Sequence, residues 1–458
     1  MIFATLLKNY SNKIFETFPW IKSREKLLFT FLLETSIFFV CLNIVNKSND
    51  TILFNLFLSF LLLIIWFILS YVFGRYEEEI IDLKRYIINK SFLILLVGFL
   101  SFYIIKIVYL FIYNYFNDFF ELKNYALAIF IIFISEIIII NLKKNKNIYK
   151  IENWIFIDGS INPKILEKIL EHSRTQVNIT FIKIKEIKNL NLSDIDGLVI
   201  ENIDFLESQY SDYLYLKKDK KIRILSLTEW SGIILQRFPS EVINQRNSSF
   251  KRFLMNNNFN IIELRLKRVS ELVISTILLS LSFPLIIFSA ILIKLEDGGP
   301  IFYTQVRTGY QEKTFRIFKL RTMKINSEEN GPIWSTKNDK RITKIGDFLR
   351  KSRIDELPQL IQVINGKISL IGPRPERPDF DKVLKEKIPN YGLRYLMKPG
   401  ITGWAQVNYP YGASITDANN KLSYDLYYIH NFSTLLDILI LFKTIKLVLY
   451  RKGAIALS

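Results

Sequence analysis

The chain has 458 residues, of which 50% are hydrophobic, and a formal net charge of +18 at pH 7. The apolar residues come in long blocks, which favours a membrane protein with a basic cytoplasmic face and argues against a soluble nucleic-acid binder. With one cysteine and two histidines, a disulfide within the chain is excluded and a zinc site is not expected.

Four apolar blocks in residues 1–145 are each long enough to cross about 30 Å of hydrocarbon as a helix. They cover approximately residues 27–45, 52–73, 92–113 and 125–142. Lysines and arginines collect before the first block, between the second and third, and after the fourth. The positive-inside rule therefore predicts a four-helix transmembrane bundle with both ends in the cytoplasm. Glu34 and Glu136 lie inside the blocks and could mark a transport path, with paired packing or snorkelling near a helix end as the alternative.

Residues 150–250 have the pattern of a small α/β Rossmann-like domain with a parallel sheet. Strands are expected near 151–157, 177–184, 197–200 and 222–225, with a helix over 164–172. A dinucleotide site would need Gly-x-Gly-x-x-Gly after the first strand, and the turn at Gly159 lacks it. We predict a degenerate domain with a structural or regulatory role.

A fifth apolar block covers residues 269–293 and has basic residues at both ends. Ser282 and Pro284 interrupt it near the middle, and a proline there removes a backbone hydrogen bond and bends the helix. Hydropathy alone favours an ordinary fifth span, which would place the rest of the chain outside the cell. A re-entrant helix over 267–294, which turns at this break and returns to the same side, would keep the rest cytoplasmic.

The residues that follow are predicted to form an α+β domain. Strands at 302–307 and 314–323 should pair as a hairpin that places Lys319 and Arg321 on one face. The segment 431–452 mixes an apolar stripe with charged residues, which suits an amphipathic helix at the headgroups better than a sixth span.

Asp355 and Glu356 are adjacent carboxylates between arginines, just before a predicted helix with Pro358 in its first turn. The positive end of the helix dipole would favour an ionised carboxylate and a bound phosphate. Four apolar residues are predicted to form the core-facing stripe of this helix: Leu357, Leu360, Ile361 and Ile364. Gly366 is predicted to end the helix.

Adjacent carboxylates cannot share one proton as a protease pair does, but one can attack while the other binds metal or guides a proton. Attack on phosphorus brings negative charge toward negative charge, so it needs basic side chains or Mg²⁺. Arg350, Arg353 and Arg374 are candidates, with Lys319 and Arg321 near them. For an isolated Asp-Glu pair, a solvated ion-pair surface would be the default interpretation.

Five motifs occur in order along this part of the chain. They are Lys319-Leu320-Arg321-Thr322-Met323, Phe348-Leu349-Arg350-Lys351, Asp355-Glu356-Leu357-Pro358-Gln359-Leu360, Ile371-Gly372-Pro373-Arg374-Pro375 and Lys398-Pro399-Gly400-Ile401-Thr402-Gly403-Trp404. Together they resemble the bacterial sugar transferases called polyprenyl-phosphate hexose-1-phosphate transferases, the monotopic phosphoglycosyl transferases. The resemblance covers residues 263–458, and the upstream part is similar to the long form of that family.

The resemblance implies a two-step displacement at the cytoplasmic face of the bacterial inner membrane, in a multi-pass protein. Asp355 would attack the β-phosphate of a UDP-sugar, release UMP and hold the sugar phosphate. Undecaprenyl phosphate would then attack and leave as undecaprenyl-diphospho-sugar, which starts an exopolysaccharide, capsule or O-antigen repeat unit. Glu356 matches the second member of the dyad, and Mg²⁺ is the implied cofactor, with Asp355 and Glu356 as candidate ligands.

The resemblance also assigns roles outside the dyad. Arg350 and Arg374 match arginines that hold phosphates, and Lys319 and Arg321 are carried over as substrate contacts. A homodimer is plausible in this family. The motifs leave the sugar open, so glucose, galactose and N-acetylated or deoxy sugars all fit.

The fifth block resembles the family's re-entrant helix, with Ser282 and Pro284 as its break. The family pair is adjacent, whereas Phe283 separates the two residues here. Lys267 and Arg268 would anchor the helix at lipid headgroups.

Two rival classes of function are weighed against this enzyme. A catalytically silent membrane scaffold for polysaccharide assembly would have an unreactive Asp355. A membrane-tethered nucleic-acid binder would need a continuous basic helix or an aromatic platform, and the sequence shows neither. Nucleic acid is therefore not an expected partner.

Overall fold

The computed structural model describes residues 19–22, 24–43, 52–76, 83–112, 122–145, 152–157, 161–171, 177–183, 195–200, 223–244, 250, 254, 261–325, 327, 339–410, 412 and 414–450. The chain divides into two compact units. The helical unit contains residues 21–150, and the second unit contains residues 1–20 and 151–458. The turn predicted at Gly159 lies outside the described residues.

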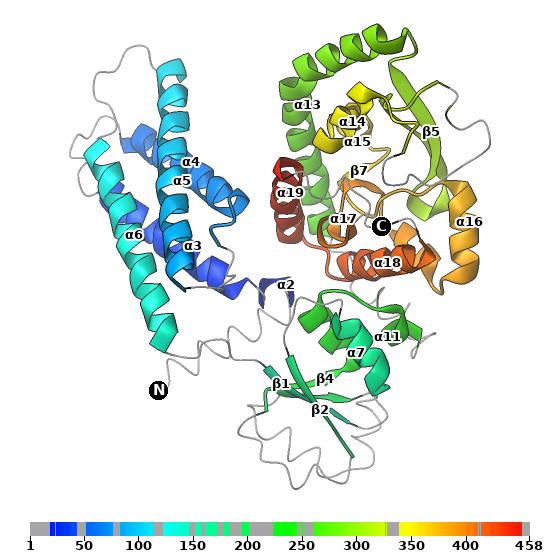
Figure 1. The fold of residues 1–458 in the computed structure, drawn as a ribbon, viewed down its shortest axis with the longest axis horizontal. Coiled ribbons are helices and arrows are strands. Elements are labelled where there is room, and N and C mark those ends of the chain that lie inside the picture. The colour runs from blue at the N-terminus through cyan, green and yellow to red at the C-terminus, as the bar shows by residue number, and fades with distance from the viewer. Residues whose placement is uncertain are drawn as a thin grey trace. The chain divides into compact units, whose positions relative to one another are not determined.

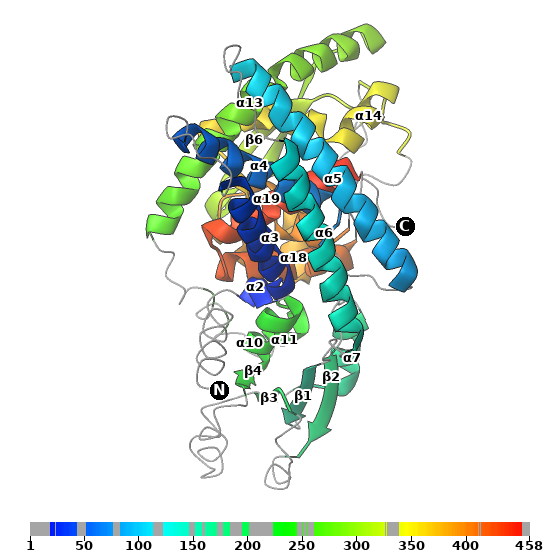
Figure 2. The same ribbon diagram turned by 90° about the vertical axis from the view of Figure 1, so that its left-hand side faces the viewer.

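All four apolar blocks of the helical unit form helices. They are α3 (Glu25–Asn43), α4 (Ile52–Val72), α5 (Leu83–Ile112) and α6 (Leu122–Asn145). The helices pack around a buried cluster that includes Phe38, Trp66 and Val97, and both ribbon views show α5 beside α6 (Figure 1, Figure 2).

The helical unit exposes apolar side chains such as Phe29, Leu95 and Phe99. Its helices hold apolar stretches of moderate length: Leu27–Cys41, Phe60–Val72, Ile88–Ile104 and Leu127–Ile138. Among the described residues, the helix whose length and composition would let it cross a membrane is α13 (Ile261–Asp297) of the second unit. A four-helix transmembrane bundle therefore stays a prediction.

Glu34 and Glu136 share one buried cation. Arg75 is completely buried and forms ion pairs with Glu34 and, at 3.1 Å, with Glu136. The Trp66 indole and the Tyr76 hydroxyl both donate to Glu34 Oε2 at 2.9 Å. These contacts join α3, α6 and the turn after α4, so the structure favours paired packing over a transport path for the two glutamates.

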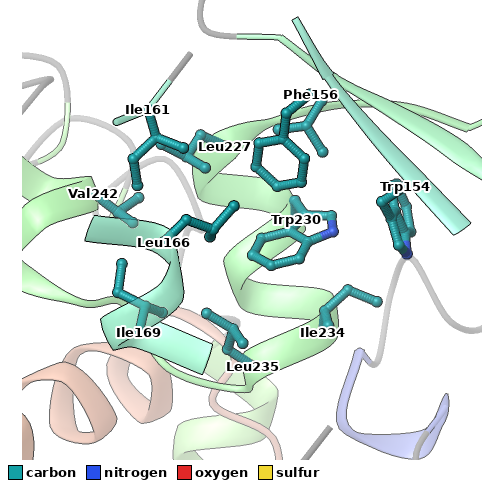
Figure 3. Packing of buried hydrophobic residues seen from close by; sticks show 11 residues of the cluster. Trp154, Phe156, Ile161, Leu166, Ile169, Leu227, Trp230, Ile234, Leu235 and Val242 are labelled. Atoms are coloured by element: carbon teal, nitrogen blue, oxygen red, sulfur yellow. The ribbon is translucent and has the colours of Figure 1, made fainter. Parts of the chain in front are cut away.

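The second unit begins with a four-stranded sheet whose pairings are all parallel, as predicted. The strands are β1 (Glu152–Ile157), β2 (Val177–Ile182), β3 (Gly197–Ile200) and β4 (Arg223–Ser226), in the order β2-β1-β3-β4. Helices α7 (Pro163–Glu171), α10 (Leu227–Trp230) and α11 (Ser240–Asn244) accompany it. Trp230 is fully buried in the core, where its ring meets Phe156 edge to face at 5.0 Å between centroids (Figure 3).

The C-terminal part of the second unit combines short sheets with helices. Its elements after α13 are β5 (Phe302–Thr308), β6 (Thr314–Leu320), α14 (Lys344–Ser352), α15 (Leu360–Ile364), β7 (Ser369–Ile371), α16 (Pro378–Lys387), β8 (Gly400–Thr402), α17 (Trp404–Asn408), α18 (Ile415–His430) and α19 (Thr434–Leu449). Strands β5 and β6 form the predicted antiparallel hairpin, and β7 pairs with β8 in parallel.

The α/β part docks directly on these C-terminal helices. The Phe238 amide donates to the Ser423 carbonyl on α18 at 2.9 Å, and the Trp404 indole on α17 donates to the Gln236 carbonyl at 3.0 Å. The ring centroids of Phe238 and Tyr427 are 5.8 Å apart. The segment that follows α10 therefore fixes the sheet to α17 and α18.

Helix α13 is continuous over 37 residues although Pro284 lies inside it. Ser282 Oγ donates to the Leu279 carbonyl at 3.3 Å, within the same helix. Figure 1 shows that the helix bends partway along its length, so its second half runs across one end of the unit. A proline that interrupts the backbone hydrogen bonds of a helix is a common cause of such a bend.

Both ends of α13 contact the same C-terminal part. At its start, Glu263 accepts a hydrogen bond from the Thr434 amide at 2.9 Å. At its end, Asp297 pairs with Arg321, and Glu296 accepts from the Ile345 amide at 3.2 Å. The helix also packs on this domain between its ends, because Ile286 and Ile293 lie in one buried cluster with Leu320.

The predicted anchoring of Lys267 at lipid headgroups is wrong. Lys267 is 7% exposed, and its Nζ donates to Asp437 at 2.7 Å, to the Ile371 carbonyl at 3.0 Å and to the Tyr428 hydroxyl at 3.1 Å. Arg268 is also used internally, because it donates to the last carbonyls of α15 at 2.7 Å. One partner is local, because Glu271 Oε1 lies 3.3 Å from Lys267 Nζ. The hydrogen-bond partners lie about 100 residues or more away, so sequence could not reveal them.

We expect Lys267→Met to lower the free energy of unfolding of the second unit by about 3–5 kcal/mol, because Asp437 and Glu271 would stay buried without their cation. Thermal unfolding of the full chain in detergent would measure this loss. Lys382→Met, at an exposed position of α16, is the matched control and should change stability by less than about 0.5 kcal/mol. Equal midpoints for the two variants would contradict the prediction.

Candidate active site

The predicted dyad lies in a tight turn between two helices. Arg353 ends α14 with φ 59°, a left-handed conformation that is uncommon for a residue with a side chain. The chain then forms a 3₁₀ helix, Ile354–Gln359, which we call the dyad turn. Pro358 lies near the end of this turn and not in the first turn of an α-helix, because the 3₁₀ segment precedes α15.

The apolar stripe predicted for the helix is wrong in part. Ile361 is 41% exposed, whereas Gln362 is buried. Gln362 Nε2 donates to the Arg316 carbonyl at 2.7 Å, and its Oε1 accepts from the Phe318 amide at 3.3 Å. A polar side chain therefore satisfies the edge of β6 and holds this strand beside the dyad turn. Gly366 follows with φ 72°, as expected of a terminating glycine.

Glu356 is held by two arginines. Arg374 Nη2 donates to its Oε1 at 2.8 Å, and Arg353 Nη1 lies 3.4 Å from its Oε2. Burial alone would raise the pKa of this carboxyl, but the charges of Arg374 and Arg353 outweigh burial and lower the pKa to about 2. Glu356 is therefore ionised at neutral pH.

Asp355 is different from its neighbour. It is 4% exposed, and its Oδ1 is buried without a hydrogen-bond partner among the described residues. Burial, with the negative charge of Glu356 second, raises its pKa to about 6. Two adjacent carboxylates thus have opposite pKa shifts, which is a common property of catalytic pairs.

Lys319 on β6 is near the dyad. Burial lowers its pKa to about 8, against the attraction of Asp355. Arg350 on α14 also acts on Asp355 through its charge, and its Nε donates to Thr322 Oγ1 at 2.8 Å. The structure thus brings Lys319, Arg350 and Arg374 together around the two carboxylates.

Arg321 is not part of this group. Its guanidinium pairs with Asp297 at the end of α13, and its Nε donates to the Pro300 carbonyl at 2.6 Å. The prediction that Arg321 shares a face with Lys319 fails because β6 ends at Leu320. Arg321 fixes the end of α13 instead.

Arg374 belongs to a loop of residues 372–376, which we call the arginine loop. It follows β7, where the Gly372 amide donates to the Thr402 carbonyl at 2.9 Å. A Cβ on Gly372 would collide with the Lys398 carbonyl, and one on Gly403 would collide with the Gly372 carbonyl. The glycines of two predicted motifs therefore allow β7 and β8 to approach closely.

Sequence reasoning missed Arg307 and Arg394. Arg307 Nη1 donates to the Pro375 carbonyl and to Glu376, both at 3.3 Å, and Arg394 Nη2 donates to the Arg374 carbonyl at 2.8 Å. Arg307 stood at the end of a predicted strand, and Arg394 precedes the last motif. No local pattern marks either residue.

Comparison with known proteins identifies the family. Residues 262–451 match the model of the bacterial sugar transferases. The UDP-glucose:undecaprenyl-phosphate glucose-1-phosphate transferase of Caulobacter vibrioides is 39% identical over 183 residues, which are 39% of this chain and 68% of that protein. The chain belongs to the bacterial sugar transferase family.

Two further sugar transferases are similar over the same region. The UDP-N-acetylgalactosamine-undecaprenyl-phosphate N-acetylgalactosaminephosphotransferase of Aeromonas hydrophila is 45% identical over 189 residues, or 41% of this chain and 45% of that protein. The UDP-glucose:undecaprenyl-phosphate glucose-1-phosphate transferase of Escherichia coli is 38% identical over 182 residues, or 39% of each chain. The chain thus spans less than half the length of these two relatives.

The raised pKa of Asp355 predicts that this carboxylate destabilises the sugar transferase fold. The folded chain holds the Asp355 proton up to about pH 6, whereas the unfolded chain releases it near the ordinary 3.8. Stability is therefore lost as the pH rises between these values. We expect Asp355→Asn to raise the free energy of unfolding by up to about 3 kcal/mol at pH 8 and to leave it unchanged at pH 3.5.

Thermal unfolding midpoints of the full chain at the two pH values would test this prediction. Asp379→Asn, at an exposed position of α16, is the control. A stabilisation by Asp355→Asn that is the same at both pH values would argue against a destabilising carboxylate.

Proposed function

We propose that this protein transfers a sugar-1-phosphate from a UDP-sugar to undecaprenyl phosphate through a covalent intermediate on Asp355. The observation that carries the proposal is the buried Asp355 carboxylate, which lies near Lys319, Arg350 and Glu356. Its Oδ1 has no hydrogen-bond partner among the described residues. Family membership and the activities for which the relatives are named support the donor and acceptor classes.

In the first step, an Asp355 oxygen attacks the β-phosphorus of the donor. A new oxygen–phosphorus bond forms, the bond to the bridging oxygen breaks, and UMP leaves with that electron pair. In the second step, a phosphate oxygen of undecaprenyl phosphate attacks the same phosphorus and releases Asp355 as a carboxylate. The acceptor is largely ionised at neutral pH, so a strong base is unnecessary.

Glu356 is proposed to position cations and not to act as a base in this arrangement. A carboxyl with a pKa of about 2 binds a proton weakly at neutral pH. Its ion pair with Arg374 instead holds the guanidinium of a side chain that is 41% exposed, and this group would bind a phosphate. Lys319 and Arg350 would neutralise the charge that develops beside Asp355.

The dyad also fits a Mg²⁺ ion shared with substrate. Among the described residues, no group of three or more His, Cys, Asp or Glu side chains could hold a metal by itself. Mg²⁺ bound through one or two carboxylates and substrate phosphates needs no such cage. The unpartnered Asp355 Oδ1, with Glu356 beside it, would supply the protein oxygens. The ion would neutralise charge on the diphosphate.

The fold supports a re-entrant placement of α13. A helix that crossed the bilayer would place its two ends on opposite sides, but both ends of α13 contact one domain. We therefore propose that α13 dips into the cytoplasmic leaflet of the bacterial inner membrane, in a multi-pass protein. The site would then lie where a water-soluble donor meets a lipid acceptor.

The reaction predicts UMP release from one member of a panel of UDP-sugars, dependent on undecaprenyl phosphate. Asp355→Asn should reduce turnover at least about 10³-fold because it removes the nucleophile, whereas Asp379→Asn should retain it. Removal of Mg²⁺ with a chelator should also reduce turnover. Turnover that is absent with every donor would favour the silent scaffold. Turnover that is unchanged in Asp355→Asn would exclude Asp355 as the nucleophile.

The pH dependence of kcat/KM should be bell-shaped. Asp355 must be ionised to attack, so activity should fall below about pH 6. Lys319 must be charged to neutralise phosphate, so activity should fall above about pH 8. Lys319→Arg should move the alkaline limb upward by more than one pH unit, because arginine stays charged. An alkaline limb at the same pH in this variant would exclude Lys319 as its origin.

A further inference from the structure

The carbonyls of the arginine loop accept hydrogen bonds from several distant elements. The Gly400 amide donates to the Pro373 carbonyl at 2.9 Å, and the Thr308 amide donates to the Glu376 carbonyl at 2.8 Å. Between them, Arg394 Nη2 donates to the Arg374 carbonyl at 2.8 Å. The loop backbone is therefore fixed on both sides of Arg374, and at Arg374 itself a side chain fixes it.

Arg394 is itself held by a buried carboxylate. Its Nη2 also donates to Asp425 Oδ2 on α18 at 2.9 Å, and its Nη1 donates to the Tyr391 hydroxyl. Arg394 is 6% exposed and Asp425 is 2% exposed. The ion pair therefore lies in the interior, behind the loop that carries Arg374.

Stability alone does not explain such a pair. Removing two charges from water is costly, and apolar residues of similar volume often stabilise a fold as well or better. The planar guanidinium can, however, bind a carboxylate, a hydroxyl and a carbonyl in one fixed geometry. Arg374 gains from such support, because its own side chain is 41% exposed.

We propose that Arg394 and Asp425 are positioning residues for Arg374. Asp425 orients Arg394, Arg394 fixes the Arg374 backbone, and the Arg374 side chain then meets Glu356 at 2.8 Å. The inference rests on the proposed function for its effect on turnover, in which Arg374 holds a substrate phosphate. Its effect on the loop backbone is independent of that function.

Hydrogen exchange measured by mass spectrometry on the full chain in detergent tests the backbone effect. Asp425→Asn keeps the shape of the side chain and removes its negative charge. Arg394→Lys keeps the positive charge and removes the planar guanidinium group that binds several acceptors at once. Both should raise exchange in the peptide of residues 371–376 by roughly tenfold or more. Tyr391→Phe, which removes the acceptor hydroxyl alone, is a milder variant that serves if either of the others fails to fold.

Asp379→Asn is the matched control for this experiment, because it makes the same Asp-to-Asn change outside the network. Asp379 lies at an exposed position of α16. Its replacement should leave exchange in the loop unchanged. Equal exchange in Asp425→Asn, Arg394→Lys and the parent chain would overturn the proposal, as would an equal rise in the control.

A double-mutant cycle with Arg374→Ala tests the effect on turnover. Asp425→Asn should lower kcat/KM by about 10- to 100-fold when Arg374 is present and should have no further effect when it is absent. If the two substitutions lowered kcat/KM by independent factors that multiply in the double mutant, Asp425 would act by another route. That result would overturn the proposal. A parent chain without turnover on any donor would instead remove the proposed function, while the exchange experiment would still decide the positioning role.

Discussion

The burial of the Asp355 carboxylate is the constraint on which the rest of the site depends. A buried ionised carboxylate is costly unless other groups compensate for it. The compensation is partial here: Lys319, Arg353 and Arg350 attract Asp355 through their charges, while its Oδ1 accepts no hydrogen bond among the described residues. Glu356, one residue later, takes the direct ion pairs instead. One carboxylate is thus available for chemistry because the other binds the nearby guanidinium groups.

The same arrangement explains why so much of the second unit converges on a short turn. The left-handed Arg353 directs the chain into the dyad turn, and Gln362 holds the β6 backbone that carries Lys319. Arg374 arrives from the other side on a loop whose approach depends on Gly372 and Gly403. The α/β part adds a further link, because Phe238 is bonded to Ser423 on α18, the helix that carries Asp425. A role for the α/β part in holding α18 is therefore consistent with its lack of a dinucleotide fingerprint.

The sequence predicted the helices and strands better than it predicted the contacts that their polar side chains make. Apolar length and periodicity are local, so the four helices of the helical unit, the parallel sheet and the β5–β6 hairpin were predictable. The dyad was marked by an unusual local pattern. No local pattern marked the partners of Lys267, Arg268 and Arg321, because tertiary packing determines which groups these side chains contact. A basic residue beside an apolar block fits a headgroup anchor or a buried ion pair equally well, and residues far away in the sequence decide between them.

The burial of Lys267 has a consequence for how α13 could sit in a membrane. A snorkelling lysine adapts to the level of the headgroups, whereas Lys267 is bound to Asp437 and to the Ile371 carbonyl. Glu271, one turn later, accepts from the Ser369 hydroxyl and, at 3.2 Å, from the Leu370 amide, so the start of α13 holds β7 along its length. Strand β7 leads directly into the arginine loop. In a re-entrant placement, the depth of the helix and the position of Arg374 would therefore be set by one network of buried contacts, and the height of the site above the lipid would follow from the fold rather than from the headgroups.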